Sequence, residues 1–389
     1  MPKLNLSASA NIILTASAVV LGTGTARSDD FLIGVATAQT GQLAPYDQPA
    51  LAGFKLAIDD INAKGGLGGK YKVRLSIKDT RSDTAQTATV GQELVDEGAK
   101  VMISPCDADP SIAIGQLTQP RHIPTITLCG TAPILTQAVG DAMFGSFPAD
   151  NLQATAIADF AISQGKRSAY LLVSPDSTYT ANLPEYFGKV FEGKGGKVMG
   201  RGSFTMGQPD FSAEVTKIKN LQEKPDIIVT SAMEPDFPAF IRQLRAAGVE
   251  IPIYGADAMN TPTIRGLGSL VDGLVFTSAG FPLPGSKLEA FNAAFKKAVG
   301  HDPETTYEVN GYEIGMIIDQ AVKNAASDDP EAIRAAIASL KNFDGITGKI
   351  TYAGTTGMPV RAVVLMQYQG GKANYISTVT PAPQEVPAP

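Results

Sequence analysis

The chain has 389 residues, of which 44% are hydrophobic and 18% are charged, and its formal net charge is −6. This length exceeds the roughly 250–300 residues at which one hydrophobic core stops growing, so we expect two domains. The composition is that of a folded soluble protein and disfavours disorder, a coiled coil and nucleic-acid binding, which needs a basic face. Two cysteines and two histidines exclude a disulfide-dense scaffold and a Cys- or His-rich metal centre.

The N-terminal residues have the pattern of a signal peptide. Lys3 gives a positive start, the apolar run 12–21 follows, and the small residues Ala26 and Ser28 suit signal peptidase. An apolar run of about ten residues is too short to cross a bilayer roughly 30 Å thick. We therefore expect a signal peptide over residues 1–28, cleaved after Ser28, and a soluble product outside the cytoplasm.

From residue 31 onward, short apolar runs alternate with longer amphipathic ones. Strands are predicted at 31–38, 71–79, 101–104 and 123–128. Helices are predicted between them at 49–66, 83–99 and near 111–119. This alternation is typical of parallel strands joined by helical crossovers, and it predicts a doubly wound α/β lobe.

The alternation restarts near residue 150 and predicts a second lobe of the same kind. Its helices are expected at 151–164, 181–193, 211–223 and 236–247, and its strands at 168–174, 197–204, 226–232, 251–257 and 273–279. Three helices are then expected near 286–299, 306–326 and 330–340, followed by a strand pair near 346–352 and 361–368. The Pro-rich tail, 380–389, is expected to be disordered. Ligands of such sheets bind beyond the carboxyl ends of the strands, so two facing lobes predict a cleft between them.

Motifs for catalysis are missing from the sequence. It contains no G-x-x-x-x-G-K-[ST], no G-x-G-x-x-G after a strand and no G-x-S-x-G. Ser163 and Lys166 fit S-x-x-K, but Gly165 between them marks the end of a helix. His122 and His301 have no triad partners in sequence. We therefore expect a binding protein that is not an enzyme and that uses no cofactor or metal.

Residues 41–66, GQLAPYDQPALAGFKLAIDDINAKGG, resemble the start of the branched-chain amino-acid (leucine)-binding proteins of ABC importers. The likeness continues through 210–229 and 242–255 and covers nearly all of 31–379. These proteins are type I periplasmic solute-binding proteins, so the resemblance implies two lobes, joined by three chain crossings, that close over a small ligand. The implied N-terminal lobe is 31–148 plus 280–358, and the implied C-terminal lobe is 149–279 plus 359–379.

The resemblance also locates the loops that would hold the ligand. Thr131 would grip an amino acid with nearby backbone groups, Asp257 would pair with its ammonium group, and Tyr46 and Tyr179 would be aromatic walls. Two departures from the family concern the loop after the third strand, where Ala and Asp replace the usual Ser, and Glu234, which stands where Tyr is common. The implied ligand-binding residues are Tyr46, Asp107, Ala108, Asp109, Cys129, Gly130, Thr131, Tyr179, Glu234 and Asp257.

The chemistry of these residues favours a cationic group in the ligand. Four acids, Asp107, Asp109, Glu234 and Asp257, follow predicted strands, and a cation beside them would gain charge-assisted hydrogen bonds. We rank an amino acid or other amine first, a cationic or amide ligand without a carboxylate second, and an aromatic acid third. The alternative for Asp107 and Asp109 is that they cap the following helix.

Cys106 and Cys129 follow neighbouring predicted strands, and the sequence leaves open whether they form a disulfide or remain buried thiols. The resemblance implies a monomeric solute-binding protein in the periplasm that delivers its ligand to ABC permease and ATPase subunits. The alternative is a sensor of the same fold that feeds a chemoreceptor or a sensor kinase. No nucleic-acid partner is expected.

Overall fold

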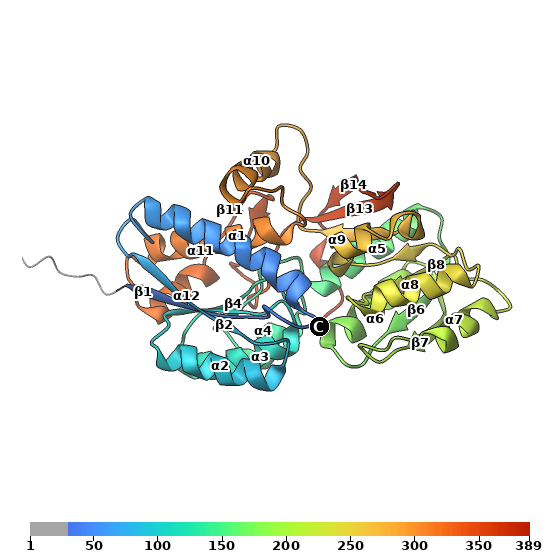
Figure 1. The fold of residues 1–389 in the computed structure, drawn as a ribbon, viewed down its shortest axis with the longest axis horizontal. Helices are drawn as coiled ribbons and strands as arrows, with labels where there is room; N and C mark the ends of the chain where they lie inside the picture. Colours follow the sequence, from blue (N-terminus) through green and yellow to red (C-terminus); the bar gives the residue numbers. More distant parts are fainter. Residues whose placement is uncertain (1–29) are drawn as a thin grey trace, which may run out of the picture.

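The computed structural model describes residues 30–389, which form two α/β lobes side by side (Figure 1). The predicted signal peptide lies outside the described residues. The sheet of the first lobe is entirely parallel. Its strand order is β2 (Val73–Asp79), β1 (Phe31–Thr37), β3 (Val101–Ser104), β4 (Thr125–Thr127) and β5 (Met143–Phe144).

Strand β1 is buried on both faces, and its alternate side chains enter two different cores. Ile33 and Val35 join the large core, whereas Leu32 and Ala36 join a smaller one with residues of the second helix layer. The larger core lies under α1 (Ala44–Ala63), α11 (Tyr307–Ala325) and α12 (Pro330–Ala338). The opposite layer contains α2 (Thr84–Asp96) and α3 (Ala108–Thr118), with α4 (Ile134–Val139) beside α3, and α10 (Lys287–Val299) lies outside α1.

The second lobe has a seven-stranded sheet with five parallel strands and two antiparallel strands at one edge. Its order is β14 (Lys372–Val379), β13 (Val363–Gln369), β10 (Val275–Ser278), β9 (Ile253–Tyr254), β8 (Ile227–Thr230), β6 (Ser168–Val173) and β7 (Lys197–Ser203). Its helices are α5 (Asp150–Ser163), α6 (Thr178–Gly193), α7 (Ser212–Lys219), α8 (Asp236–Ala246) and α9 (Pro262–Arg265). The chain therefore passes between the sheets three times, after β5, after β10 and before β13.

Two glycines allow helices α1 and α11 to pack in close contact. A Cβ atom on Gly53 would lie 1.7 Å from the carbonyl oxygen of Glu308, and one on Gly311 would lie 1.9 Å from that of Ala50. These contacts involve backbone atoms, so only glycine fits at either position. The close packing brings the first turns of both helices together, and the rings of Tyr46 and Tyr307 meet edge to face with their centroids 5.9 Å apart.

The structure corrects three of the sequence predictions. Helix α3 starts at Ala108 rather than near residue 111. The predicted strands near 346–352 and 361–368 do not form a ladder, because β12 (Lys349–Ile350) pairs with β11 (Phe343–Asp344) and β13 pairs with the unpredicted β14. The expected disordered tail instead lies on the second lobe, where Lys194 forms an ion pair with Glu385 and the Asn151 amide donates to the carbonyl of Pro387. No helix among residues 30–389 is long and apolar enough to span a membrane.

Candidate functional site

A small cavity lies between the two lobes, beyond the carboxyl ends of strands from both sheets. Its volume is about 20 Å³, which is enough for roughly one water molecule. A larger ligand can enter only when contacts between the lobes loosen. The residues that line it are Leu43, Tyr46, Cys106, Asp107, Cys129, Thr131, Tyr179, Met233, Asp257, Ala258 and Tyr307.

Asp257 is the acid that both lobes contact. It follows β9, and its carboxylate accepts hydrogen bonds from the hydroxyl groups of Tyr179 in the second lobe and Tyr307 in the first, each over 3.2 Å. The Tyr307 hydroxyl also lies 2.8 Å from the backbone oxygen of Asp257. Burial raises the pKa of the Asp257 carboxyl to about 6, although hydrogen bonds from Gln153 and Tyr179 partly oppose this shift.

The phenol groups around Asp257 stay neutral at ordinary pH. Burial raises the pKa of Tyr46, Tyr179 and Tyr307 well above the usual value for tyrosine. Each hydroxyl can therefore donate one hydrogen bond and accept others. The Tyr179 hydroxyl accepts from the backbone N–H of Ala258 over 3.2 Å while it donates to Asp257, which fixes its direction.

The loop after β3 touches the start of α6 in the other lobe. Asp107 accepts the hydroxyl of Ser177 over 3.2 Å, and Asp109 accepts the hydroxyl of Thr178 over 2.9 Å. Of the two acids, Asp107 is the N-cap of α3, and its carboxylate also accepts from the N–H of Ala108. Asp107 thus caps its own helix, as the alternative expected, and it also lines the cavity.

A buried aspartate in α1 that sequence analysis missed fixes two of the loops at the cavity. The Asp47 carboxylate accepts hydrogen bonds from the backbone N–H groups of Ala38, after β1, and Cys106, after β3, over 2.5 and 2.8 Å. Burial raises its pKa to about 7. The clue in the sequence was an acid in the first turn of a helix that follows a strand, a pattern that also suits an exposed helix start.

A disulfide joins Cys106 and Cys129 and thereby links the loops after β3 and β4. The pair lines the cavity together with Thr131. This observation selects the bridged alternative over buried thiols for the described chain. Because the bridge closes a loop of 23 residues, it restrains two walls of the site relative to each other.

The other predicted residues lie near the cavity without lining it. Gly130 contributes a carbonyl that accepts the hydroxyl of Thr127. Glu234 donates its backbone N–H to the Tyr46 hydroxyl over 2.9 Å, while its side chain accepts the hydroxyl of Thr261 and borders a separate surface hollow. Four residues that line the cavity were not predicted, and they are Leu43, Met233, Ala258 and Tyr307.

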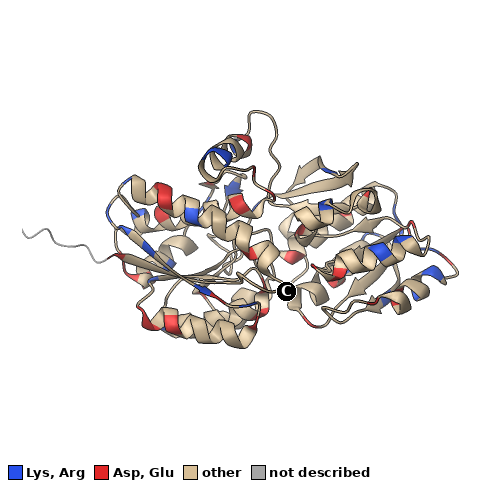
Figure 2. Cartoon of the chain, viewed as in Figure 1, with Lys and Arg blue, Asp and Glu red and all other residues tan. Residues whose placement is uncertain are grey.

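The cavity is acidic. None of the described residues that line it is Lys, Arg or His, whereas Asp107 and Asp257 both do so. Figure 2 shows acidic segments where the lobes meet, while basic segments are spread over helices, strands and loops farther out on both lobes. Among residues 30–389, no group of three or more His, Cys, Asp or Glu side chains could hold a metal ion. The arrangement therefore suits an organic cation with N–H donors.

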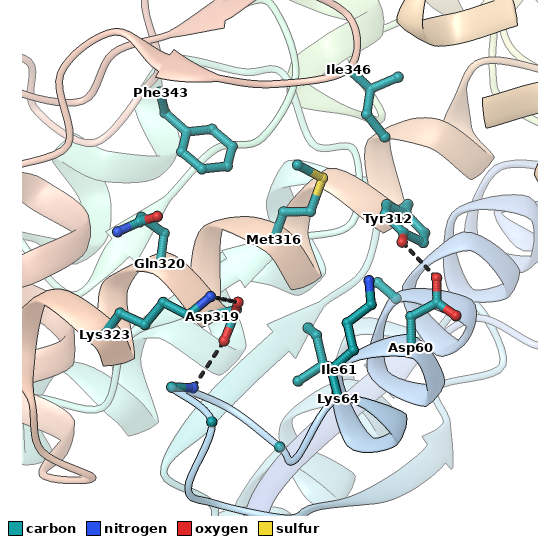
Figure 3. Close-up of a pocket in the computed structure, with 14 residues that line it drawn as sticks. Asp60, Ile61, Lys64, Tyr312, Met316, Asp319, Gln320, Lys323, Phe343 and Ile346 are labelled. Carbon is teal, nitrogen blue, oxygen red and sulfur yellow. Dashed lines mark hydrogen bonds and ion pairs between the residues drawn. The ribbon is translucent and has the colours of Figure 1, made fainter. Parts of the chain in front are cut away.

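A second hollow, of about 620 Å³, lies at the other ends of α1 and α11 (Figure 3). Its two acids already have partners. The Asp60 carboxylate accepts the hydroxyl of Tyr312 over 2.7 Å, and Asp319 accepts the N–H of Gly68 over 2.9 Å and the ammonium of Lys323 over 2.5 Å. Two lysines, Lys64 and Lys323, line this hollow beside its acids, so it does not favour a cation and we do not assign the ligand to it.

Comparison with known proteins identifies the family. The family described as periplasmic binding protein matches residues 31–373. The chain belongs to the periplasmic binding protein family. It is 26% identical to the Leu/Ile/Val-binding protein BraC3 of Rhizobium johnstonii over 347 residues, which cover 88% of this chain and 93% of that protein.

Solved structures of periplasmic binding proteins have the same fold. The leucine-binding protein LivK of Thermotoga maritima is similar with a TM-score of 0.83 and 26% identity, over 90% of this chain and 99% of that one. A solute-binding protein of R. palustris in complex with benzoate is similar with a TM-score of 0.81 and 22% identity, over 91% and 97% of the two chains. The two-lobed α/β architecture predicted from sequence is thus confirmed, and the family implies a periplasmic location.

Proposed function

We propose that this protein captures a small amine-bearing solute, an amino acid or a related amine, between its lobes and delivers it to an ABC importer. The observation that carries the proposal is that the buried carboxylate of Asp257 accepts hydrogen bonds from hydroxyl groups of both lobes at the cavity. An ammonium group placed there would be bound by both halves at once, so it would favour the closed state over the open one.

The chain's relatives agree with this function. Its similarity to proteins named for binding leucine, isoleucine and valine supports an amino acid or amine as ligand. A benzoate-type ligand is less well supported, because it has no ammonium group to pair with the acids that line the cavity, Asp107 and Asp257. The partners would be the permease and ATPase subunits of the importer.

Several finer assignments belong to the same proposal. The ligand contacts would include Tyr46, Asp107, Thr131, Tyr179 and Asp257. Residues 1–28 would be the signal peptide, and the mature protein would act as a monomer. The lobes would be 31–148 plus 280–358 and 149–279 plus 359–379, which agrees with the membership of the two sheets.

Replacement of one acid tests the proposal. Asp257→Asn keeps the size of the side chain but removes the charge, so the affinity for an amine ligand should fall about 10- to 100-fold. Isothermal titration calorimetry with a panel of amino acids and simple amines measures this, and circular dichroism checks the fold. Unchanged affinity in a folded variant would remove Asp257 from the site, and no binding by any compound of the panel would refute an amine ligand.

A further inference from the structure

Asp150 is a buried acid at the cleft that has no partner. It is the first residue of α5, which begins just after the chain first passes from one sheet to the other. Its side chain is fully buried, and neither carboxylate oxygen makes a hydrogen bond of ordinary geometry, although the Thr131 hydroxyl lies near enough to lower its pKa. Asp47 and Asp257, by contrast, accept hydrogen bonds at both of their oxygens. Burying an unpaired carboxylate costs free energy, so the Asp150 carboxyl must either be protonated or bind a cation.

The position of Asp150 places its charge beside the ligand cavity. Its backbone N–H donates to the carbonyl of Thr131, a residue that lines the cavity, over 2.9 Å. Burial raises the pKa of Asp150 well above its usual value, the nearby Thr131 hydroxyl opposes this, and the charges of Asp257 and Asp107 raise it further. Asp107 and Asp257 thus line the cavity, and Asp150 lies beside it, close enough for the charges of the three carboxyl groups to interact.

No basic side chain among the described residues that line the cavity pairs with these acids. The residues that line the cavity include no Lys, Arg or His, and no side-chain cluster among residues 30–389 could hold a metal ion. The positive end of α5 lies next to Asp150, but the N–H groups there make no hydrogen bond to its carboxylate. A zwitterionic amino acid would add one positive group and also one negative group, so it would leave the excess negative charge unchanged.

We propose that the cleft selects a ligand with net positive charge, an organic diamine, whose first ammonium group binds Asp257 and whose second binds Asp150 and Asp107. This inference rests on the proposed function and narrows its ligand class. The second ammonium group would supply the N–H donors that Asp150 lacks. It would also replace the Ser177 hydroxyl at Asp107, which is one of the contacts that must loosen to admit a ligand.

The test compares three ligands of similar size by isothermal titration calorimetry with the mature protein. The probes are 1,4-diaminobutane, 1-aminobutane and L-leucine, which carry two ammonium groups, one ammonium group, and one ammonium group with a carboxylate. We expect the diamine to bind the wild-type protein about 10- to 100-fold more tightly than either of the others, as two additional charge-assisted hydrogen bonds allow.

The variant Asp150→Asn should lose most of this preference and bind the diamine about tenfold more weakly, with little change for the monoamine. Asp236→Asn is the matched control. Asp236 is also a buried first residue of a helix with one unpartnered oxygen. Its other oxygen accepts the backbone N–H of Gly207, which does not line the cavity, whereas Asp150 is bonded through its backbone to Thr131, which does. This variant should keep the preference for the diamine.

The outcomes separate this inference from the proposed function. Tighter binding of leucine than of the diamine by the wild-type protein would overturn the inference and leave the proposed function standing, even if Asp150→Asn does not fold. Equal binding of the diamine by wild-type protein and a folded Asp150→Asn variant would also overturn it. Binding of none of the amines or amino acids would refute both.

Discussion

Helices α1 and α11 line two hollows, one at each end of the helix pair. The two hollows differ in the side chains that lie beside their acidic residues. At the cleft end, Tyr46 and Tyr307 face a cavity whose acids have no basic partner among the described residues that line it, and Asp150 lies beside it. At the outer end, Asp319 has an ammonium partner in Lys323 (Figure 3). The outer hollow is far larger, about 620 against 20 Å³. None of the described residues that line the cleft cavity is basic, whereas Lys64 and Lys323 line the outer hollow. The charges of the lining residues, rather than the volume, therefore mark the site for a cationic ligand.

Both hollows depend on the close contact between α1 and α11. The substitution Gly311→Ala should disrupt this contact. The new methyl group would lie against the carbonyl oxygen of Ala50, so the helices must separate. We expect a loss of about 3 kcal/mol in the free energy of unfolding, measured by chemical denaturation. Gly193→Ala is the control, because its Cβ meets nothing within 4 Å, and it should be no less stable than the wild type. Equal stability of both variants would contradict the packing described here.

The pH should affect ligand affinity and the stability of the unliganded protein in opposite directions. Burial raises the pKa of Asp107 and Asp257 to about 6, and both must be ionised to bind an ammonium group. Ligand affinity should therefore fall as the pH drops below about 6, by up to tenfold per pH unit for each proton taken up. Calorimetry between pH 5 and pH 8 measures this, and constant affinity over that range would contradict it.

The same two carboxyl groups should affect the unliganded protein with the other sign. Their pKa values are higher in the folded state than the ordinary 3.8, so the folded state binds more protons between about pH 4 and 6. The stability that they contribute is present at low pH and is lost as the pH rises through about 6. Thermal unfolding without ligand, compared between wild type and Asp257→Asn, isolates the contribution of Asp257.

The smallest effect is expected at the outer hollow. Asp60→Asn keeps an oxygen that can accept the Tyr312 hydroxyl, so stability should change by less than about 1 kcal/mol. Ligand affinity should stay within about twofold of the wild-type value. Titration of this variant beside Asp257→Asn shows whether the two ends of the helix pair differ as described, and a large loss of affinity in Asp60→Asn would contradict the assignment.

Much of the fold could be predicted from the sequence, because buried parallel strands are continuous apolar runs. Runs such as 31–38 and 101–104 lie on β1 and β3. Strand β14 was missed because it is an edge strand, largely exposed, with polar residues along both faces. The start of α3 was placed too late because Pro110 lies in its first turn, where proline is tolerated.

The site was predicted only where residues follow strands. Asp107, Thr131 and Asp257 could be located because loops after parallel strands meet at one edge of a sheet. Tyr307 lines the cavity and Asp150 lies beside it. Each begins a helix that follows one of the first two chain crossings, and no local pattern encodes those crossings. Their roles depend on how distant segments pack together, which the three-dimensional structure alone supplies.

The most direct test of the central claim is a crystal structure of the protein with a bound amine ligand. The account predicts the ligand in the cleft between the lobes, with an ammonium nitrogen within hydrogen-bonding distance of the Asp257 carboxylate. A ligand in the outer hollow, or a ligand in the cleft with its carboxylate where the ammonium group is expected, would contradict the account.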